Sequence, residues 1–203
     1  MLVIGEKING AIPIVARAIA ERNEAFIRDL ARRQVNAGVD YLDVCAGTSP
    51  DKEMDALKWL IEIVQDETDT RLCVDSPDAR IIEEALPLVK RCGLINSVSG
   101  EGDKCEVIFP LIKGSDWEVV VLTCGSEGIP DTAPKKVEIA CALIEKAGSY
   151  GIGPERLFIE PLVLSPATDN DSMLMFMASV REIKRLFPTV RTVSRTPTLT
   201  FGM

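Results

Sequence analysis

Short apolar runs alternate with amphipathic segments along most of the chain. Seven runs rich in Val, Ile and Leu have the length of buried strands: Leu2–Gly5, Tyr41–Cys45, Arg71–Asp75, Gly93–Ser97, Glu118–Thr123, Leu157–Glu160 and Val190–Val193. Between most of them, apolar residues recur at helical spacing, which predicts helices over Glu24–Gly38, Lys52–Glu67, Asp78–Arg91, Lys135–Tyr150 and Ser172–Phe187. Strands that alternate with helices indicate right-handed βαβ units and a parallel sheet.

No glycine-rich phosphate-binding turn follows the first predicted strand, and this favours a TIM-type (β/α) barrel over a doubly wound sheet. A complete barrel has eight units and usually about 250 residues. This chain has 203 residues, and its pattern stops just after the seventh strand. We therefore expect an α/β protein with about seven of the eight barrel units, in a single domain over residues 1–203 that is truncated at its C-terminus.

The chain contains no histidine, which restricts the chemistry open to it. Ser-His-Asp and Cys-His nucleophile systems and His-ligated zinc are excluded. The six cysteines form no C-x-x-C pair and stand in apolar segments, which is typical of buried, reduced thiols in a cytoplasmic protein.

The net charge of −8 argues against a nucleic-acid partner. No apolar run approaches the ~20 residues that span a bilayer, and the first residues do not read as a secretory leader.

Polar residues stand at the ends of six predicted strands, where a barrel has its active site. They are Glu6, Asp43, Asp75, Asn96, Thr123 and Glu160. One such residue alone would be interpreted as a cap for the following helix, but the repetition predicts a polar pocket. Several carboxylates could collect a divalent metal, although such a site normally has a more basic or phosphate-binding surround. They also suit a flat heterocycle that presents N–H and NH₂ donors beside a carbonyl, such as a pterin.

Six motifs occur in order along the chain. They are VIGEKING (Val3–Gly10), YLDV (Tyr41–Val44), LCVDS (Leu72–Ser76), LINSV (Leu94–Val98), LTCGSEGIP (Leu122–Pro130) and FIEPL (Phe158–Leu162). Through this ordered set the chain resembles, from Met1 to about Arg191, the pterin-binding methyltransferases that take a methyl group from methyltetrahydrofolate and pass it to a corrinoid protein.

The resemblance implies an enzyme that moves the N5-methyl group of methyltetrahydrofolate to the Co(I) corrinoid (cobalamin) of a partner protein. It also implies a homodimer that works in cytoplasmic one-carbon metabolism. Because the corrinoid supplies the nucleophile, the enzyme needs none of its own, which agrees with a chain without histidine. The protein then contributes orientation, together with polarisation of N5 as the methyl group leaves.

The same resemblance implies roles for particular residues. Asp75 and Asn96 match the carboxylate and the amide that bind the pterin ring. Glu160 stands where the family usually has the Asp of I-D-P-L, so the charge is kept on a side chain one methylene longer. The other positions that fall at the same pocket are Glu6, Asn9, Asp43 and Ser97. Of these, Ser97 either contacts the ring or only shapes the loop. No residue is expected to bind a metal.

The C-terminal segment departs from the family pattern. Family members have a G-L-S-N-x-S-[FY]-G segment whose Asn bonds near N5, whereas this chain reads TVSRTPTLTFGM over Thr192–Met203. The Asn is absent near Thr196–Thr198, so the catalytic residue is unassigned.

Two alternatives follow from the sequence. One is a truncated pterin-binding protein with impaired catalysis. The other is a dihydropteroate synthase, which shares the pterin pocket but normally uses an Arg-His pair that a chain without histidine lacks.

Overall fold

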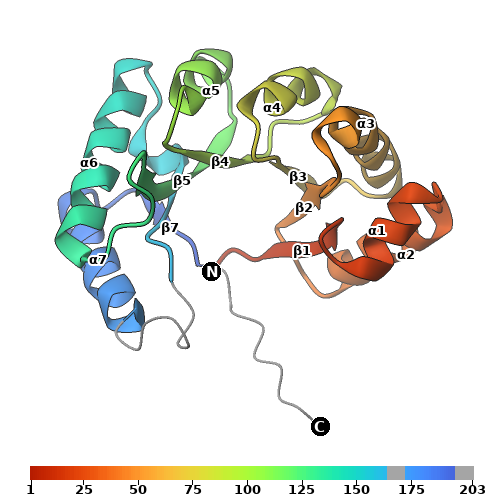
Figure 1. Cartoon of the computed structure of the whole chain (residues 1–203), viewed down its shortest axis with the longest axis horizontal. Helices are drawn as coiled ribbons and strands as arrows, with labels where there is room; N and C mark the ends of the chain where they lie inside the picture. Colours follow the sequence, from red (N-terminus) through yellow and green to blue (C-terminus); the bar gives the residue numbers. More distant parts are fainter. Residues whose placement is uncertain (164–171, 195–203) are drawn as a thin grey trace, which may run out of the picture. The chain divides into compact units, whose positions relative to one another are not determined.

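The computed structural model describes residues 1–163 and 172–194. The chain divides into two compact units, one made of Met1–Ser97 with Glu106–Val119 and the other of Val98–Cys105 with Val120–Met203. Seven strands follow one another in sequence order in one sheet (Figure 1). They are β1 (Ile4–Asn9), β2 (Tyr41–Cys45), β3 (Arg71–Asp75), β4 (Leu94–Gly100), β5 (Glu118–Gly125), β6 (Leu157–Glu160) and β7 (Arg191–Thr192).

Helices connect these strands. They are α1 (Pro13–Ala20), α2 (Glu24–Asn36), α3 (Pro50–Glu67), α4 (Ala79–Ala85), α5 (Lys104–Ile112), α6 (Ala133–Ser149) and α7 (Ser172–Leu186), with short 3₁₀ turns η1 (Leu86–Leu88) and η2 (Pro154–Arg156). Sequential strands that alternate with helices are the arrangement of a TIM-like barrel. The described residues supply seven of its eight strands, which confirms the predicted fold class. None of the helices in this part of the chain is long and apolar enough to cross a membrane.

Several predicted boundaries need correction. Helices α1 and α5 are additional to the predicted set. The helix predicted over Asp78–Arg91 ends at Ala85 and continues only as the turn η1, because Pro87 has no N–H to donate and disfavours helical geometry in the residue before it. Strands β4 and β5 run past the ends of their apolar runs, so Asn96 and Thr123 lie within the strands.

The first strand is also longer than predicted and contains Glu6. Its pairing with β2 shifts register between Gly5 and Ile8, which marks a bulge at Glu6 and Lys7. The backbone N–H of Lys7 donates instead to Oε1 of Gln34 on α2, at 2.9 Å. A Cβ on Gly5 would lie 2.7 Å from the same oxygen, so a larger residue here would displace the Gln34 side chain from this contact.

The core of the first unit lies between its strands and the helices beside them. Figure 1 shows α2, α3 and α4 on one side of β1, β2 and β3. The buried apolar side chains come from both layers and include Ile27, Ala31, Leu57, Leu60 and Val64 of the helices and Leu42, Val44, Leu72 and Val74 of the strands. Side-chain caps start two of the helices, since Asn23 accepts from Phe26 N–H and Asp78 from Arg80 N–H.

A network of polar side chains lies at the amino ends of β2 and β3. The hydroxyl of the buried Tyr41 donates to the carboxylate of Glu118. The guanidinium of Arg71 stacks 4.5 Å from the centre of the Tyr41 ring and lies 3.2 Å from the Glu118 carboxylate. These side chains satisfy one another's hydrogen-bonding groups at the amino ends of the strands.

Candidate functional site

The pairing of β2, β3 and β4 places five polar side chains on one face of the sheet. Asp43 pairs with Cys73, and Cys45 pairs with Asp75, which in turn pairs with Asn96. Side chains alternate along a strand, and paired residues of parallel strands point to the same side. Three adjacent strands therefore present alternating carboxylates and thiols beside one amide.

Asp43 is the most deeply buried carboxylate of this group, with 1% of its surface exposed. The side-chain amide of the buried Asn96 donates to Oδ1 of Asp43 at 3.4 Å. Burial raises the pKa of Asp43 to about 7, and the charge of Asp75 adds to the rise, while hydrogen bonds from Cys73 and Asn96 oppose it. Asp43 consequently exchanges its proton near neutral pH, the range in which histidine normally works.

The two thiols act as donors to the carboxylates. Burial raises the pKa of the Cys45 thiol to about 12, reinforced by the charges of Asp75 and Asp43 and by the hydrogen bond to Asp75. Burial also raises the pKa of Cys73, which bonds to Asp43. Both thiols remain protonated at neutral pH. Cys45 is only half-buried, and all six cysteines are free thiols.

The remaining predicted residues of the first unit differ in their surroundings. Glu6 is exposed on β1, and its charge is one of those that raise the pKa of Asp43. Asn9 ends β1 half-buried, and its Oδ1 accepts the N–H of Ala11 at 2.8 Å, so this side chain also shapes the turn before α1. Ser97 follows Asn96 in β4 and is half-buried. The structure thus brings Asp43, Asp75 and Asn96 together, with Glu6 close enough to act electrostatically on Asp43.

Glu160 belongs to the second unit, where it ends β6 as predicted and is buried. The hydroxyl of Thr123 donates to its backbone carbonyl at 3.4 Å. Two residues further on, the carbonyl of Leu162 accepts from Nζ of Lys136, a fully buried side chain of α6, at 2.7 Å. Lys136 could not be recognised from the sequence, because its position in an amphipathic helix gives no sign that its ammonium group is buried.

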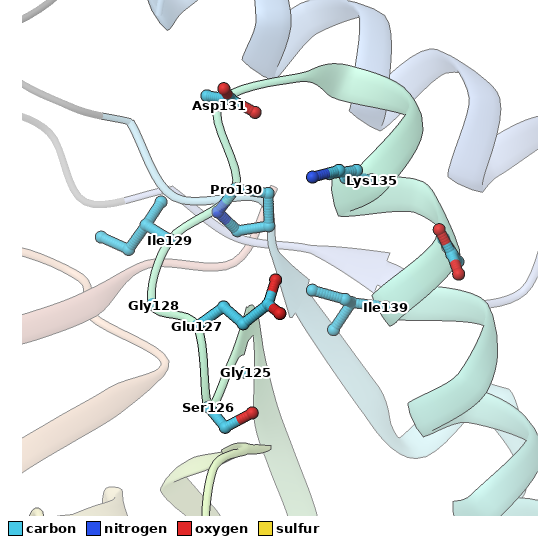
Figure 2. A pocket seen from close by; sticks show the side chains of 10 residues that line it. Gly125, Ser126, Glu127, Gly128, Ile129, Pro130, Asp131, Lys135 and Ile139 are labelled. Atoms are coloured by element: carbon cyan, nitrogen blue, oxygen red, sulfur yellow. The ribbon is translucent and has the colours of Figure 1, made fainter.

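The second unit also contains a cavity of about 590 Å³ between the loop after β5 and helix α6 (Figure 2). Gly125–Pro130 of the LTCGSEGIP motif forms one wall, and Lys135, Glu138 and Ile139 of α6 form the other. Figure 2 shows the side chains of Glu127 and Lys135 directed into the space between loop and helix. None of the predicted site residues lines this cavity.

Two further predictions concern metal binding and the C-terminal segment. In the part of the chain that the structure describes, no group of three His, Cys, Asp or Glu side chains is arranged to hold a metal ion. The segment Thr196–Thr198, where the family Asn is absent, lies outside the described residues.

Comparison with known proteins identifies relatives over the whole chain. Residues 16–203 match the family described as pterin binding enzyme. The chain is 46% identical over 205 residues to a methylcorrinoid:tetrahydrofolate methyltransferase of Eubacterium limosum, covering all of this chain and 76% of the relative. It is 30% identical over 216 residues to a methionine synthase of Mycobacterium tuberculosis, of which it covers 18%.

Solved structures show a likeness of fold. A dihydropteroate synthase of Xanthomonas albilineans with 4-aminobenzoic acid superposes with a TM-score of 0.69 at 21% identity, covering 94% of this chain and 69% of that one. A dihydropteroate synthase of Coxiella burnetii in complex with pteroic acid gives a TM-score of 0.66 at 15% identity, covering 94% and 71%.

Proposed function

Because the chain belongs to the family of pterin-binding enzymes, we propose that it transfers a methyl group between N5 of tetrahydrofolate and the corrinoid of a partner protein. The observation that carries this proposal is the grouping of Asp43, Asp75 and Asn96 on adjacent strands. The relatives of the chain are methyltransferases. The likeness to dihydropteroate synthases is one of fold and supports no second candidate.

The three side chains complement the edge of a pterin. The half-buried Asp75 carboxylate offers two oxygens to the N3–H and 2-amino donors of the ring. The Asn96 amide gives one hydrogen to Asp43 and keeps its oxygen and second hydrogen for the neighbouring donor and acceptor of the ring. Asp43 fixes the amide, so Asn96 meets the ligand in a single orientation.

The chain's residues serve both directions of the reaction. The sequence resemblance describes transfer from methyltetrahydrofolate to the corrinoid, and the name of the Eubacterium limosum relative is written in the opposite sense. A catalyst lowers the same barrier either way, so concentrations decide the net direction. The partner's corrinoid supplies the cobalt that accepts or gives the methyl group, and this chain binds and orients the pterin.

Other parts of the proposal come from the sequence. We include Glu6, Asn9, Ser97 and Glu160 as further residues for the pterin substrate, and a single domain over residues 1–203. We also include a corrinoid protein as partner, a homodimer and a cytoplasmic location.

Calorimetric titration with 5-methyltetrahydrofolate tests the proposal. Asp75→Ala removes a charged acceptor, which typically costs about 2–3 kcal/mol, so Kd should rise by roughly 30- to 150-fold. Asp69→Ala is the matched control, because Asp69 is a fully exposed acid just before the same strand. An Asp75→Ala variant that binds as tightly as the unchanged protein would refute the assignment.

A further inference from the structure

A buried carboxylate outside the predicted site lies directly behind it. Glu53 is in the first turn of α3 and is 6% exposed. Its Oε1 accepts a hydrogen bond from the hydroxyl of Ser76 at 2.5 Å. Ser76 is 3% exposed and follows Asp75 directly in the chain.

Ser76 is the centre of a small hydrogen-bond network. Besides donating to Glu53, its Oγ accepts the N–H of Asp78 at 3.1 Å. Its backbone N–H donates to the carbonyl of Asn96, also at 3.1 Å. One residue thus connects the start of α3, the cap of α4 and strand β4. The bond to β4 reaches Asn96, and Ser76 itself follows Asp75 in the chain, so the network adjoins both residues assigned to the pterin.

A carboxylate is costly to bury unless its environment compensates for the lost water. Glu53 has two compensating features. It lies near the N-terminus of α3, where the helix dipole favours negative charge, and it receives the hydroxyl hydrogen of Ser76. An apolar side chain would avoid the cost at this position, and what the carboxylate adds instead is its hydrogen bond with Ser76.

We propose that Glu53, acting through Ser76, is a positioning residue for the pterin-binding pair Asp75 and Asn96. This inference rests on the proposed function. By accepting the hydroxyl hydrogen, Glu53 turns the lone pairs of Ser76 toward the N–H of Asp78 and fixes the residue. Asp75 is then held by the pairing of β3 on one side and by the fixed Ser76 on the other. The bond from Ser76 to the Asn96 carbonyl keeps both ring contacts in register.

The first experiment compares Kd values for 5-methyltetrahydrofolate by calorimetry. Glu53→Ala removes the acceptor and should weaken binding by about tenfold, the effect of one lost hydrogen bond. Glu53→Gln keeps an acceptor oxygen at the same position and should restore Kd to within about threefold. Glu62→Ala changes an exposed acid on the same helix and should leave Kd unchanged.

A double-mutant cycle separates positioning from general destabilisation. In an Asp75→Ala background, Glu53→Ala should have a clearly smaller effect on Kd than in the unchanged protein, because one of the two contacts that it positions is already lost. A general loosening of the fold would weaken binding by a similar factor in both backgrounds, and that result would overturn the inference. Ser76→Ala removes the same bridge from its other end, so it gives an independent reading if Glu53→Ala does not fold.

The outcomes also distinguish this inference from the function on which it rests. If the unchanged protein does not bind the pterin, or if Asp75→Ala binds it equally well, the proposed function fails. If both behave as expected and Glu53→Ala and Ser76→Ala bind normally, only the positioning role is wrong.

Discussion

Asp43 lies in surroundings that disfavour its charged form. It is buried, it faces the charge of Asp75, and it holds the Asn96 amide. Its pKa of about 7 means that the folded chain keeps a proton there that an unfolded Asp releases near pH 4. Protonation of this one residue therefore links stability and the charge of the site to pH.

Asp43→Asn should change how stability depends on pH. Because the folded pKa is above the unfolded value, folding takes up a proton between about pH 4 and pH 7, and the free energy of unfolding falls as the pH rises through that range. The variant lacks this titration. Its stability relative to the unchanged protein should be greater at pH 8 than at pH 5 by roughly 2–3 kcal/mol. Urea unfolding at both values measures the difference, and an equal difference at pH 5 and pH 8 would contradict the assignment.

Cys45 should resist alkylation despite its partial exposure. With a pKa of about 12, roughly one Cys45 thiol in ten thousand is ionised at pH 8, and the thiolate is the reactive form. Iodoacetamide should modify Cys45 at least about a hundredfold more slowly in the folded chain than in urea. Mass-spectrometric mapping measures both rates, and rates within tenfold of each other would show that the thiol ionises readily.

At the scale of the elements, the two ends of β2 and β3 have different roles. Tyr41, Arg71 and Glu118 satisfy one another at the first residues of β2, β3 and β5, whereas Asp75 ends β3 and pairs with Asn96 within β4. In a barrel, the first end is associated with stability and the second with function. Substitutions at the two ends should therefore separate the two properties.

Tyr41→Phe tests this separation. The change leaves the buried Glu118 carboxylate without its hydroxyl donor, which should lower the free energy of unfolding by about 1–3 kcal/mol. The Kd for 5-methyltetrahydrofolate should stay the same, because the lost hydroxyl contacts Glu118 and Arg71, which lie outside the residues assigned to the pterin. Chemical denaturation and calorimetry give the two values. A large loss of affinity in a folded variant would show that the ends are coupled.

Much of this arrangement could be predicted from the sequence. The bounds of β2, β3 and β6 match their apolar runs, because a buried strand needs continuous apolar side chains. The bulge at Glu6 could not be predicted, since it depends on Gln34 from a helix elsewhere in the chain.

The candidate site, too, could be predicted only in part. The sequence pointed to Asp43, Asp75 and Asn96 through their places in successive strands. It gave no sign of Glu53, because only packing reveals that its charge is buried against Ser76.

For the molecule as a whole, the sequence predicts that the chain binds the pterin but transfers the methyl group slowly. The family Asn is absent near Thr196–Thr198, and the loss of one positioned donor typically lowers a rate by roughly 10²–10³. We expect pterin binding with methyl transfer slowed by at least that factor. Mass spectrometry of methyltetrahydrofolate, with a methylated corrinoid protein and tetrahydrofolate as reactants, measures the rate. Full-rate transfer by the unchanged chain would refute this expectation.

The alternation of thiols and carboxylates on β2 and β3 has a consequence for an enzyme that handles a reactive methyl group. Sulfur nucleophiles close to such a group invite a side reaction in which the protein alkylates itself. Burial and neighbouring negative charge keep Cys45 and Cys73 protonated, and a protonated thiol is a poor nucleophile. The acidic surroundings that we propose for the pterin would thereby also protect the enzyme from inactivation by its own substrate.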